Sequence, residues 1–141
     1  VLDLFAGTGQ LGLEALSRGA EHCTFVDQRR EAAALVRENV KLCGFTDRSR
    51  VVQEDALSFL SVCREKFDVV FLDPPYQSGL LEKSLKLLTQ FDILREHGII
   101  VCESGTEWAI PTQEPPYEAG REYRYGQIKL SLCRRTGSVI Q

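Results

Sequence analysis

Short runs of strand-forming residues alternate with helical patterns through most of this chain. The clearest strand is Phe67 to Leu72, whose Val-Val-Phe-Leu run indicates burial on both faces. This alternation predicts an α/β fold with a doubly wound, mostly parallel sheet, in which ligands bind at the carboxyl ends of the strands. The expected strands cover residues 1–5, 23–26, 51–54, 67–72 and 99–102, and the expected helices cover residues 11–17, 30–43, 56–63 and 80–88.

Two further patterns refine this prediction. In the second helix, apolar residues recur at helical spacing and predict a buried stripe. Near the end of the chain, residues 117–123 and 127–133 predict a hairpin about Tyr125-Gly126, which would add an antiparallel strand to the sheet. The predicted stripe contains Ala32, Ala33, Leu35, Val36, Val40 and Cys43.

Length and composition fit one domain, because 141 residues with 43% hydrophobic content can bury a core. No apolar run approaches the roughly 20 residues of a membrane helix, and no signal peptide begins the chain, so we expect a cytoplasmic protein, with a monomer favoured. Five cysteines without a CxxC pair predict reduced thiols and no metal site. The first residue already lies in a predicted strand, so we expect that a natural N-terminal segment is missing.

Charge is unevenly distributed along the chain. Residues 119–141 carry five basic residues against Glu122, a net of +4, which leaves −7 for the remainder. Such a tail can offer a basic edge to phosphates, although a solvated hairpin explains it equally well. The basic residues are Arg121, Arg124, Lys129, Arg134 and Arg135.

A glycine-rich loop follows the first strand. Gly7, Gly9 and Gly12 match GxGxxG, which permits a tight turn and close approach of a ligand to the backbone. The pattern alone does not separate NAD, FAD and S-adenosylmethionine proteins. Asp3 on the preceding strand would repel a pyrophosphate but can help to hold the ammonium group of a methionine moiety. Alternatively, it merely caps the loop.

Two more acids end predicted strands. Asp27 follows Gly9 by 18 residues, close to the interval of about 20 at which an acid accepts hydrogen bonds from ribose hydroxyls. Asp55, followed by Ala56, is placed to accept the exocyclic amine of adenine. Asp55 can also cap the helix that begins at Ala56, and one side chain can serve both roles.

The sequence Asp73-Pro74-Pro75-Tyr76 follows the fourth strand and is suited to an aromatic amine. Such an amine is a poor nucleophile because its lone pair is delocalised into the ring. Asp73 and the Pro74 carbonyl can each accept one N–H and turn the lone pair toward a methyl donor. The prolines stiffen the loop at φ of about −65°, and Tyr76 offers a ring face for stacking, worth roughly 1 to 3 kcal/mol. A plain proline turn is the alternative.

These motifs together resemble the guanine-N2 methyltransferases of bacterial small-subunit (16S) ribosomal RNA. The resemblance rests on residues 1–20, Glu38-Asn39, Asp55-Ala56 and residues 67–76. It implies a Rossmann-like fold with seven strands ordered 3-2-1-4-5-7-6, strand 7 antiparallel, S-adenosyl-L-methionine as cofactor, and ribosomal RNA or the assembling small subunit as partner. It also implies that the catalytic residues are Asp73, Pro74, Pro75 and Tyr76, and that the cofactor-binding residues are Asp3, Phe5, Ala6, Gly7, Gly9, Asp27, Gln28, Asp55, Ala56 and Asp73.

Three other functions remain open from the sequence. Adenine-N6 methylation of DNA or RNA uses a similar amine motif, although no target-recognition domain is evident. A nicotinamide oxidoreductase would explain only the glycine loop. A noncatalytic, methyltransferase-like binding module predicts damaged motifs, whereas both motifs are intact here.

Overall fold

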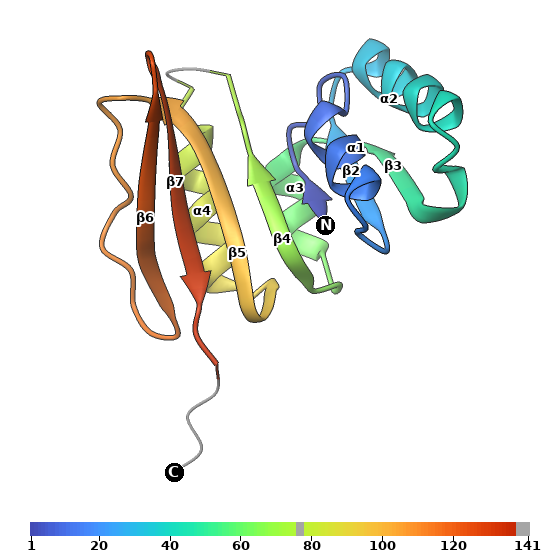
Figure 1. The fold of residues 1–141 in the computed structure, drawn as a ribbon. Coiled ribbons are helices and arrows are strands. Elements are labelled where there is room, and N and C mark those ends of the chain that lie inside the picture. Colours follow the sequence, from blue (N-terminus) through green and yellow to red (C-terminus); the bar gives the residue numbers. More distant parts are fainter. Residues whose placement is uncertain (76–77, 138–141) are drawn as a thin grey trace. The chain divides into compact units, whose positions relative to one another are not determined.

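The computed structural model describes residues 1–75 and 78–137. The chain divides into two compact units, Val1–Cys63 and Arg64–Gln141. Figure 1 labels the helices and strands of both units.

The first unit is an alternation of parallel strands and helices. The strand order is β3-β2-β1, with Asp3 beside Phe25 and Asp27 beside Gln53 in the register. Helices α1 and α2 cover one face of these strands and α3 lies on the other (Figure 1). The elements are β1 (Leu2–Asp3), α1 (Gln10–Ser17), β2 (Cys23–Asp27), α2 (Arg30–Leu42), a 3-10 turn (Thr46–Arg48), β3 (Ser49–Gln53) and α3 (Ala56–Val62).

The core of the first unit forms around Phe25, which is fully buried. A Cβ atom on Gly12 would overlap the Phe25 ring and lie 2.7 Å from Cys23 Sγ, so only glycine lets α1 approach β2 this closely. The predicted stripe of α2 is partly wrong, because Leu35 is 40% exposed and Cys43 lies beyond the helix end on the surface. The buried members of the stripe are Ala32, Ala33, Val36 and Val40.

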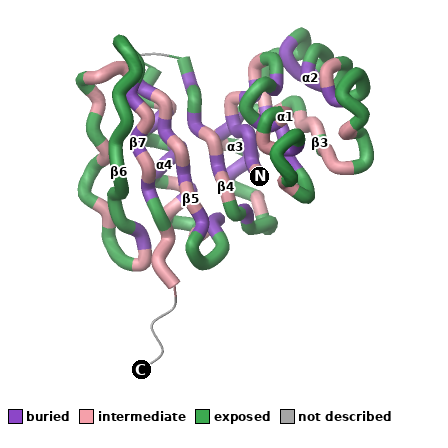
Figure 2. The backbone as a smooth tube through the Cα atoms, viewed as in Figure 1, coloured by how far each residue is buried: buried purple, intermediate pink, exposed green. Residues whose placement is uncertain are grey.

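The second unit combines one parallel and two antiparallel pairings. Strands β4 and β5 run parallel, and β7 lies antiparallel between β5 and β6. The predicted hairpin is confirmed, with Gly126 in the left-handed conformation at φ 60°. Figure 2 shows that β6 is exposed along nearly its whole length. The elements are β4 (Phe67–Leu72), α4 (Leu80–Gln90), β5 (Leu94–Gly105), β6 (Tyr117–Tyr125) and β7 (Ile128–Arg135).

Strand β5 begins five residues earlier than the prediction of residues 99–102. The register with β4 shifts between Phe67 and Val69, and His97 has φ 64° at this irregularity. Gly98 is required beside it, since a Cβ there would lie 2.9 Å from the Arg95 carbonyl oxygen. Because the residues of this segment are polar, the apolar pattern of the sequence does not reveal the strand there.

The strand order of the two units is β3-β2-β1 and β4-β5-β7-β6, which gives the predicted order 3-2-1-4-5-7-6. Strand 7 is antiparallel, as predicted. The α/β, doubly wound fold class is therefore confirmed.

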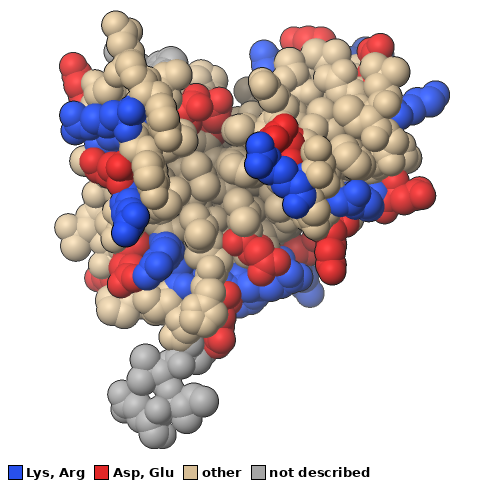
Figure 3. All heavy atoms as spheres, viewed as in Figure 1, with Lys and Arg blue, Asp and Glu red and all other residues tan. Residues whose placement is uncertain are grey.

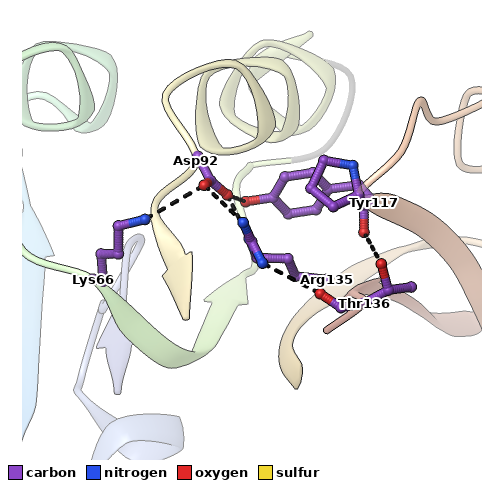
Figure 4. Close-up of polar contacts among 6 residues, drawn as sticks. Lys66, Asp92, Tyr117, Arg135 and Thr136 are labelled. Atoms are coloured by element: carbon purple, nitrogen blue, oxygen red, sulfur yellow. Dashed lines mark hydrogen bonds and ion pairs between the residues drawn. The ribbon is translucent and has the colours of Figure 1, made fainter. Parts of the chain in front are cut away.

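Asp92 holds the end of α4 to the end of β7 (Figure 4). Its two oxygens accept hydrogen bonds from Arg135 Nε at 2.7 Å and Nη2 at 3.0 Å, and Oδ1 also accepts from the Tyr117 hydroxyl at 2.7 Å. Lys66 Nζ lies 3.4 Å from Oδ2. The Arg135 hydrogen bonds, helped by Tyr117 and by the charges of Arg135 and Lys66, outweigh burial and lower the pKa of Asp92 well below its usual range.

Replacing Asp92 with Asn should lower the free energy of unfolding at pH 7 by about 1 to 2 kcal/mol. The estimate takes the lower part of the range for charged hydrogen bonds, because the side chain is 37% exposed and solvent screens it. Since the folded-state pKa is depressed, this stabilisation is present above the unfolded pKa of about 3.9 and is lost as pH falls through the folded value. Urea denaturation at pH 7 and pH 3 checks this, and equal stability of the two proteins at pH 7 would contradict it.

Candidate active site

The loop between β1 and α1 exposes its backbone at Gly7. Gly7 has φ 59° and Gly9 has φ 83°, a conformation that other residues rarely adopt. The Gly9 N–H donates to the Ala6 carbonyl at 2.7 Å, and α1 begins at the next residue. A Cβ on Gly7 would meet no atom of the described chain within 4 Å. A ligand can therefore approach the loop at Gly7.

Asp27 is the last residue of β2 and is hydrogen-bonded to this loop. Its Oδ2 accepts the Gly7 N–H at 3.0 Å, and its Oδ1 accepts the Arg29 backbone N–H at 2.9 Å. The Arg29 guanidinium donates to both oxygens, at 3.2 and 3.3 Å. The Asp27 side chain is 10% exposed, whereas that of Arg29 is 58% exposed. Ribose hydroxyls would therefore have to replace the exposed Arg29 side chain as partners of Asp27.

The surroundings of Asp27 favour its ionised form. Burial opposes its ionisation, but hydrogen bonds from Arg29 and from the Gly7 N–H outweigh burial and keep the pKa of Asp27 below its usual value. The carboxylate is thus an acceptor at neutral pH, which is the state that hydroxyl donors need.

Replacing Asp27 with Ala should weaken binding of S-adenosylhomocysteine, the demethylated product of the expected cofactor, by about 1.5 to 3 kcal/mol, because the predicted charged hydrogen bonds to the ribose would be lost. Calorimetry on the folded variant measures this. Arg29→Ala is the matched control, and we expect it to bind at least as tightly as the original chain because it removes the competing guanidinium. Unchanged affinity of Asp27→Ala would remove Asp27 from the site.

Asp3 is 1% exposed, and its Oδ2 accepts the Gly12 N–H at 3.0 Å. A carboxylate at the first turn of α1 is favourable because the helix N-terminus carries partial positive charge. The structure thus gives Asp3 a capping role, which the sequence offered as the alternative. Its contact with a ligand ammonium group stays a prediction.

Asp55 caps α3, as the sequence allowed. Its Oδ2 accepts the Ser58 N–H at 3.0 Å and lies 3.2 Å from Ser58 Oγ, while the side chain stays exposed. The contact of Asp55 with adenine stays a prediction. The other predicted cofactor residues lie next to these acids and glycines: Phe5 is half-buried, Ala6 and Ala56 are buried, and Gln28 is exposed.

Asn39 supports the glycine loop from α2. Its Nδ2 donates to the Thr8 carbonyl at 2.9 Å. Thr8 lies between the two left-handed glycines, so this hydrogen bond fixes the loop tip. Sequence reasoning noted Asn39 only as part of a resemblance and did not predict this role.

The second unit carries the amine motif beside a cavity of about 670 Å3. This volume falls within the roughly 300 to 1,000 Å3 typical of small-molecule sites. Asp73 follows β4 and is exposed, and Pro74 and Pro75 line the cavity. The predicted residue Tyr76 lies outside the described residues. Trp108 also lines the cavity, and its Nε1 donates to Glu82 Oε1 at 3.3 Å.

Glu103 lies beside Asp73. In the parallel register Leu72 pairs with Cys102, so the next residues of the two strands follow side by side. Glu103 also lines the cavity, and in its protonated form it can donate a side-chain hydrogen bond to Asp73. Burial, then this hydrogen bond and the Asp73 charge, raise the pKa of Glu103 to about 7. Glu103 can therefore gain or lose a proton near neutral pH.

Sequence reasoning missed Glu103, although the signal was present. An acid directly after an expected strand selected Asp27, Asp55 and Asp73, and Glu103 directly follows the strand expected at residues 99–102. The same rule therefore finds it.

The basic edge is weaker than the charge count predicts. Arg121 and Arg124 on β6 have no ion pair within the described part of the chain, and both are exposed. Lys129 is 3% exposed and paired. Figure 3 shows basic and acidic side chains alternating over the hairpin. The paired residues are Lys129 with Glu122, Arg134 with Glu118 and Arg135 with Asp92.

All five cysteines are free, and burial raises the pKa of the Cys102 thiol to about 12. Within residues 1–75 and 78–137, no group of three or more His, Cys, Asp or Glu side chains is arranged to hold a metal ion. In the same residues, no helix has the length and apolarity that a bilayer crossing needs.

The fold and the motifs at its strand ends define a Rossmann-like methyltransferase. The chain belongs to the family described as conserved hypothetical protein 95, whose model matches residues 1–134.

Relatives from two bacteria support this assignment. The Bacillus subtilis protein YlbH is 37% identical over 139 residues, which cover 96% of this chain and 76% of YlbH. The ribosomal RNA small subunit methyltransferase D of Escherichia coli is 37% identical over 134 residues, which cover 95% of this chain and 67% of the relative. The solved structure of Escherichia coli YhhF matches with a TM-score of 0.88 and 36% identity, covering 97% of this chain and 76% of YhhF.

Proposed function

We propose that this protein transfers a methyl group from S-adenosyl-L-methionine to the exocyclic N2 amine of a guanine in small-subunit ribosomal RNA. The observation that carries the proposal is Asp73-Pro74-Pro75 beside Glu103 at the cavity of the second unit. The name of the Escherichia coli relative, which specifies ribosomal RNA of the small subunit, supports the choice of substrate.

The donor set of the first unit suits the cofactor. Asp27 is the last residue of β2, and Asp55 lies just beyond the adjacent parallel strand β3; they would accept hydrogen bonds from the ribose hydroxyls and the adenine amine, respectively. Gly7 would let the ligand approach the backbone, because the space beside it is open within the described chain. S-adenosylmethionine would supply an electrophilic methyl group on a sulfonium, so this reaction needs no metal to activate the donor.

The acceptor residues of the second unit suit an aromatic amine. Asp73 and the Pro74 carbonyl would accept the two N–H bonds of the amine and draw its lone pair out of conjugation with the ring. The nitrogen gains positive charge as the new bond forms, and the adjacent carboxylates stabilise that charge. The alkylated nitrogen then releases one proton, which the Asp73–Glu103 pair can accept. Catalysis of this kind depends mainly on positioning and electrostatics.

The experiment that tests the proposal is direct. The protein is incubated with tritiated S-adenosylmethionine and either unmodified small-subunit ribosomal RNA or 30S particles, and the RNA is digested to nucleosides. We expect N2-methylguanosine in at least one of the two substrates. Label recovered as N6-methyladenosine would replace guanine with adenine as the target, and absence of label from both substrates would overturn the proposal.

A further inference from the structure

Glu103 lines the cavity next to Pro74 and Pro75, and the proposed reaction does not yet use it in recognition. It is half-buried, lies on β5 beside Asp73, and in its protonated form can donate a hydrogen bond to Asp73. A carboxyl group in this position costs free energy to desolvate, unless a ligand supplies a donor. Glu103 in the cavity lining and Asp73 beside it therefore present two adjacent carboxyl groups to whatever base carries the amine.

The edges of guanine and adenine differ in what they offer to such a pair. Guanine presents three neighbouring N–H donors, one on N1 and two on the N2 amine. Adenine presents its amine beside N1, which is an acceptor with no hydrogen. Enzymes that act on an unstacked base read this Watson–Crick edge by hydrogen bonds. Three donors match three acceptors here: Asp73, the Pro74 carbonyl and Glu103.

We propose that Glu103 selects guanine by accepting the N1–H of the base whose N2 amine Asp73 and Pro74 hold. This inference rests on the proposed function and names the residue that sets its base specificity. Above pH 7, where Glu103 is ionised, adenine is rejected because the Glu103 carboxylate would face the N1 lone pair, and a buried acceptor without a donor is strongly unfavourable.

The protonation of Glu103 agrees with this role. In the empty site, burial and Asp73 raise the pKa of Glu103 to about 7, so a large fraction of the Glu103 carboxyl is protonated near neutral pH. When guanine binds, its N1–H takes the place of that proton, which leaves to solvent.

The test uses 2-aminopurine, which keeps the 2-amine of guanine but has no hydrogen on N1. After the methylated guanine has been located by the experiment above, 2-aminopurine is placed at that position in the same RNA substrate. At a pH well above 7, where Glu103 is ionised, single-turnover rates are then compared for the original chain, Glu103→Gln and Glu114→Gln. Glu114 is an exposed acid of the same unit outside the cavity lining, so its variant controls for the loss of one charge.

We expect the original chain to methylate guanine about ten- to hundredfold faster than 2-aminopurine, as expected for the loss of one hydrogen bond to a charged group. Glu103→Gln should lose most of this preference, because its amide can donate to N1 of 2-aminopurine. Glu114→Gln should keep the original ratio. A purely structural role of Glu103 would lower both rates and leave the ratio unchanged.

Two outcomes would overturn the inference alone: equal rates on the two bases by the original chain, or an undiminished preference in Glu103→Gln. The first outcome is measured on the original chain, so the inference can be refuted even if Glu103→Gln misfolds. Absence of guanine methylation by the original chain would instead overturn the proposed function, and this inference with it. Trp108, the single tryptophan of the chain, lines the same cavity, and its fluorescence reports entry of the base independently of methyl transfer.

Discussion

Asp73→Ala should lower the single-turnover rate of methyl transfer by about 10²- to 10³-fold, as is typical when one preorganised electrostatic contact is removed. In the proposed reaction, Asp73 contacts an amine that gains positive charge only as the methyl group arrives. Loss of Asp73 therefore raises the barrier to methyl transfer more than it weakens RNA binding. RNA affinity should change little, because most of it comes from phosphate contacts.

Asp68→Ala is the matched control for this variant. Asp68 lies on β4, the strand that Asp73 follows. It is exposed and makes a surface ion pair with Arg95 at 2.8 Å, which contributes little to stability. We expect it to retain the original rate. A rate for Asp73→Ala within tenfold of the original would remove Asp73 from the catalytic residues.

The second large effect concerns Gly12, where Gly12→Val should lower the free energy of unfolding by about 3 kcal/mol or more. A Cβ at this position overlaps Phe25, which is fully buried and cannot move aside without disturbing the core. The added methyl groups of valine make the overlap worse. Urea denaturation followed by circular dichroism measures the change.

Gly105→Val provides the comparison for stability. Gly105 lies in β5, and a Cβ there would meet nothing within 4 Å in the described chain. Valine also favours strands. If Gly12→Val were as stable as Gly105→Val, the stability of the first unit would not depend on the close approach of α1 to β2.

The fold was largely predictable because apolar runs and glycine stops mark most of its elements. The β4 strand and the C-terminal hairpin are examples, since their bounds depend on local residue preferences. The start of β5 was not predictable, because Arg95, Glu96 and His97 are exposed and give no apolar signal. Its irregularity depends on pairing with β4, which lies far away in sequence.

For the candidate site, the sequence predicted only which residues lie at the ends of strands. Topology brings Asp27 and Asp73 to strand ends, but their partners depend on side-chain geometry. The Arg29 guanidinium on Asp27 and the raised pKa of Glu103 beside Asp73 are examples. Asp3 shows the same limit, since a carboxylate at a helix start can serve a cap or a ligand.

The position of β7 between β5 and β6 has a consequence for synthesis of the chain. Strand β7 leaves the ribosome after β5 and β6 and pairs with both, so neither can complete its hydrogen bonding at that edge until β7 has emerged. Until then, β5 presents an unpaired edge that includes Ile99 and Val101, and such edges promote aggregation. Nascent chains in which β7 (Ile128–Arg135) has not emerged from the ribosome should therefore depend on chaperones far more than chains in which β7 has fully emerged.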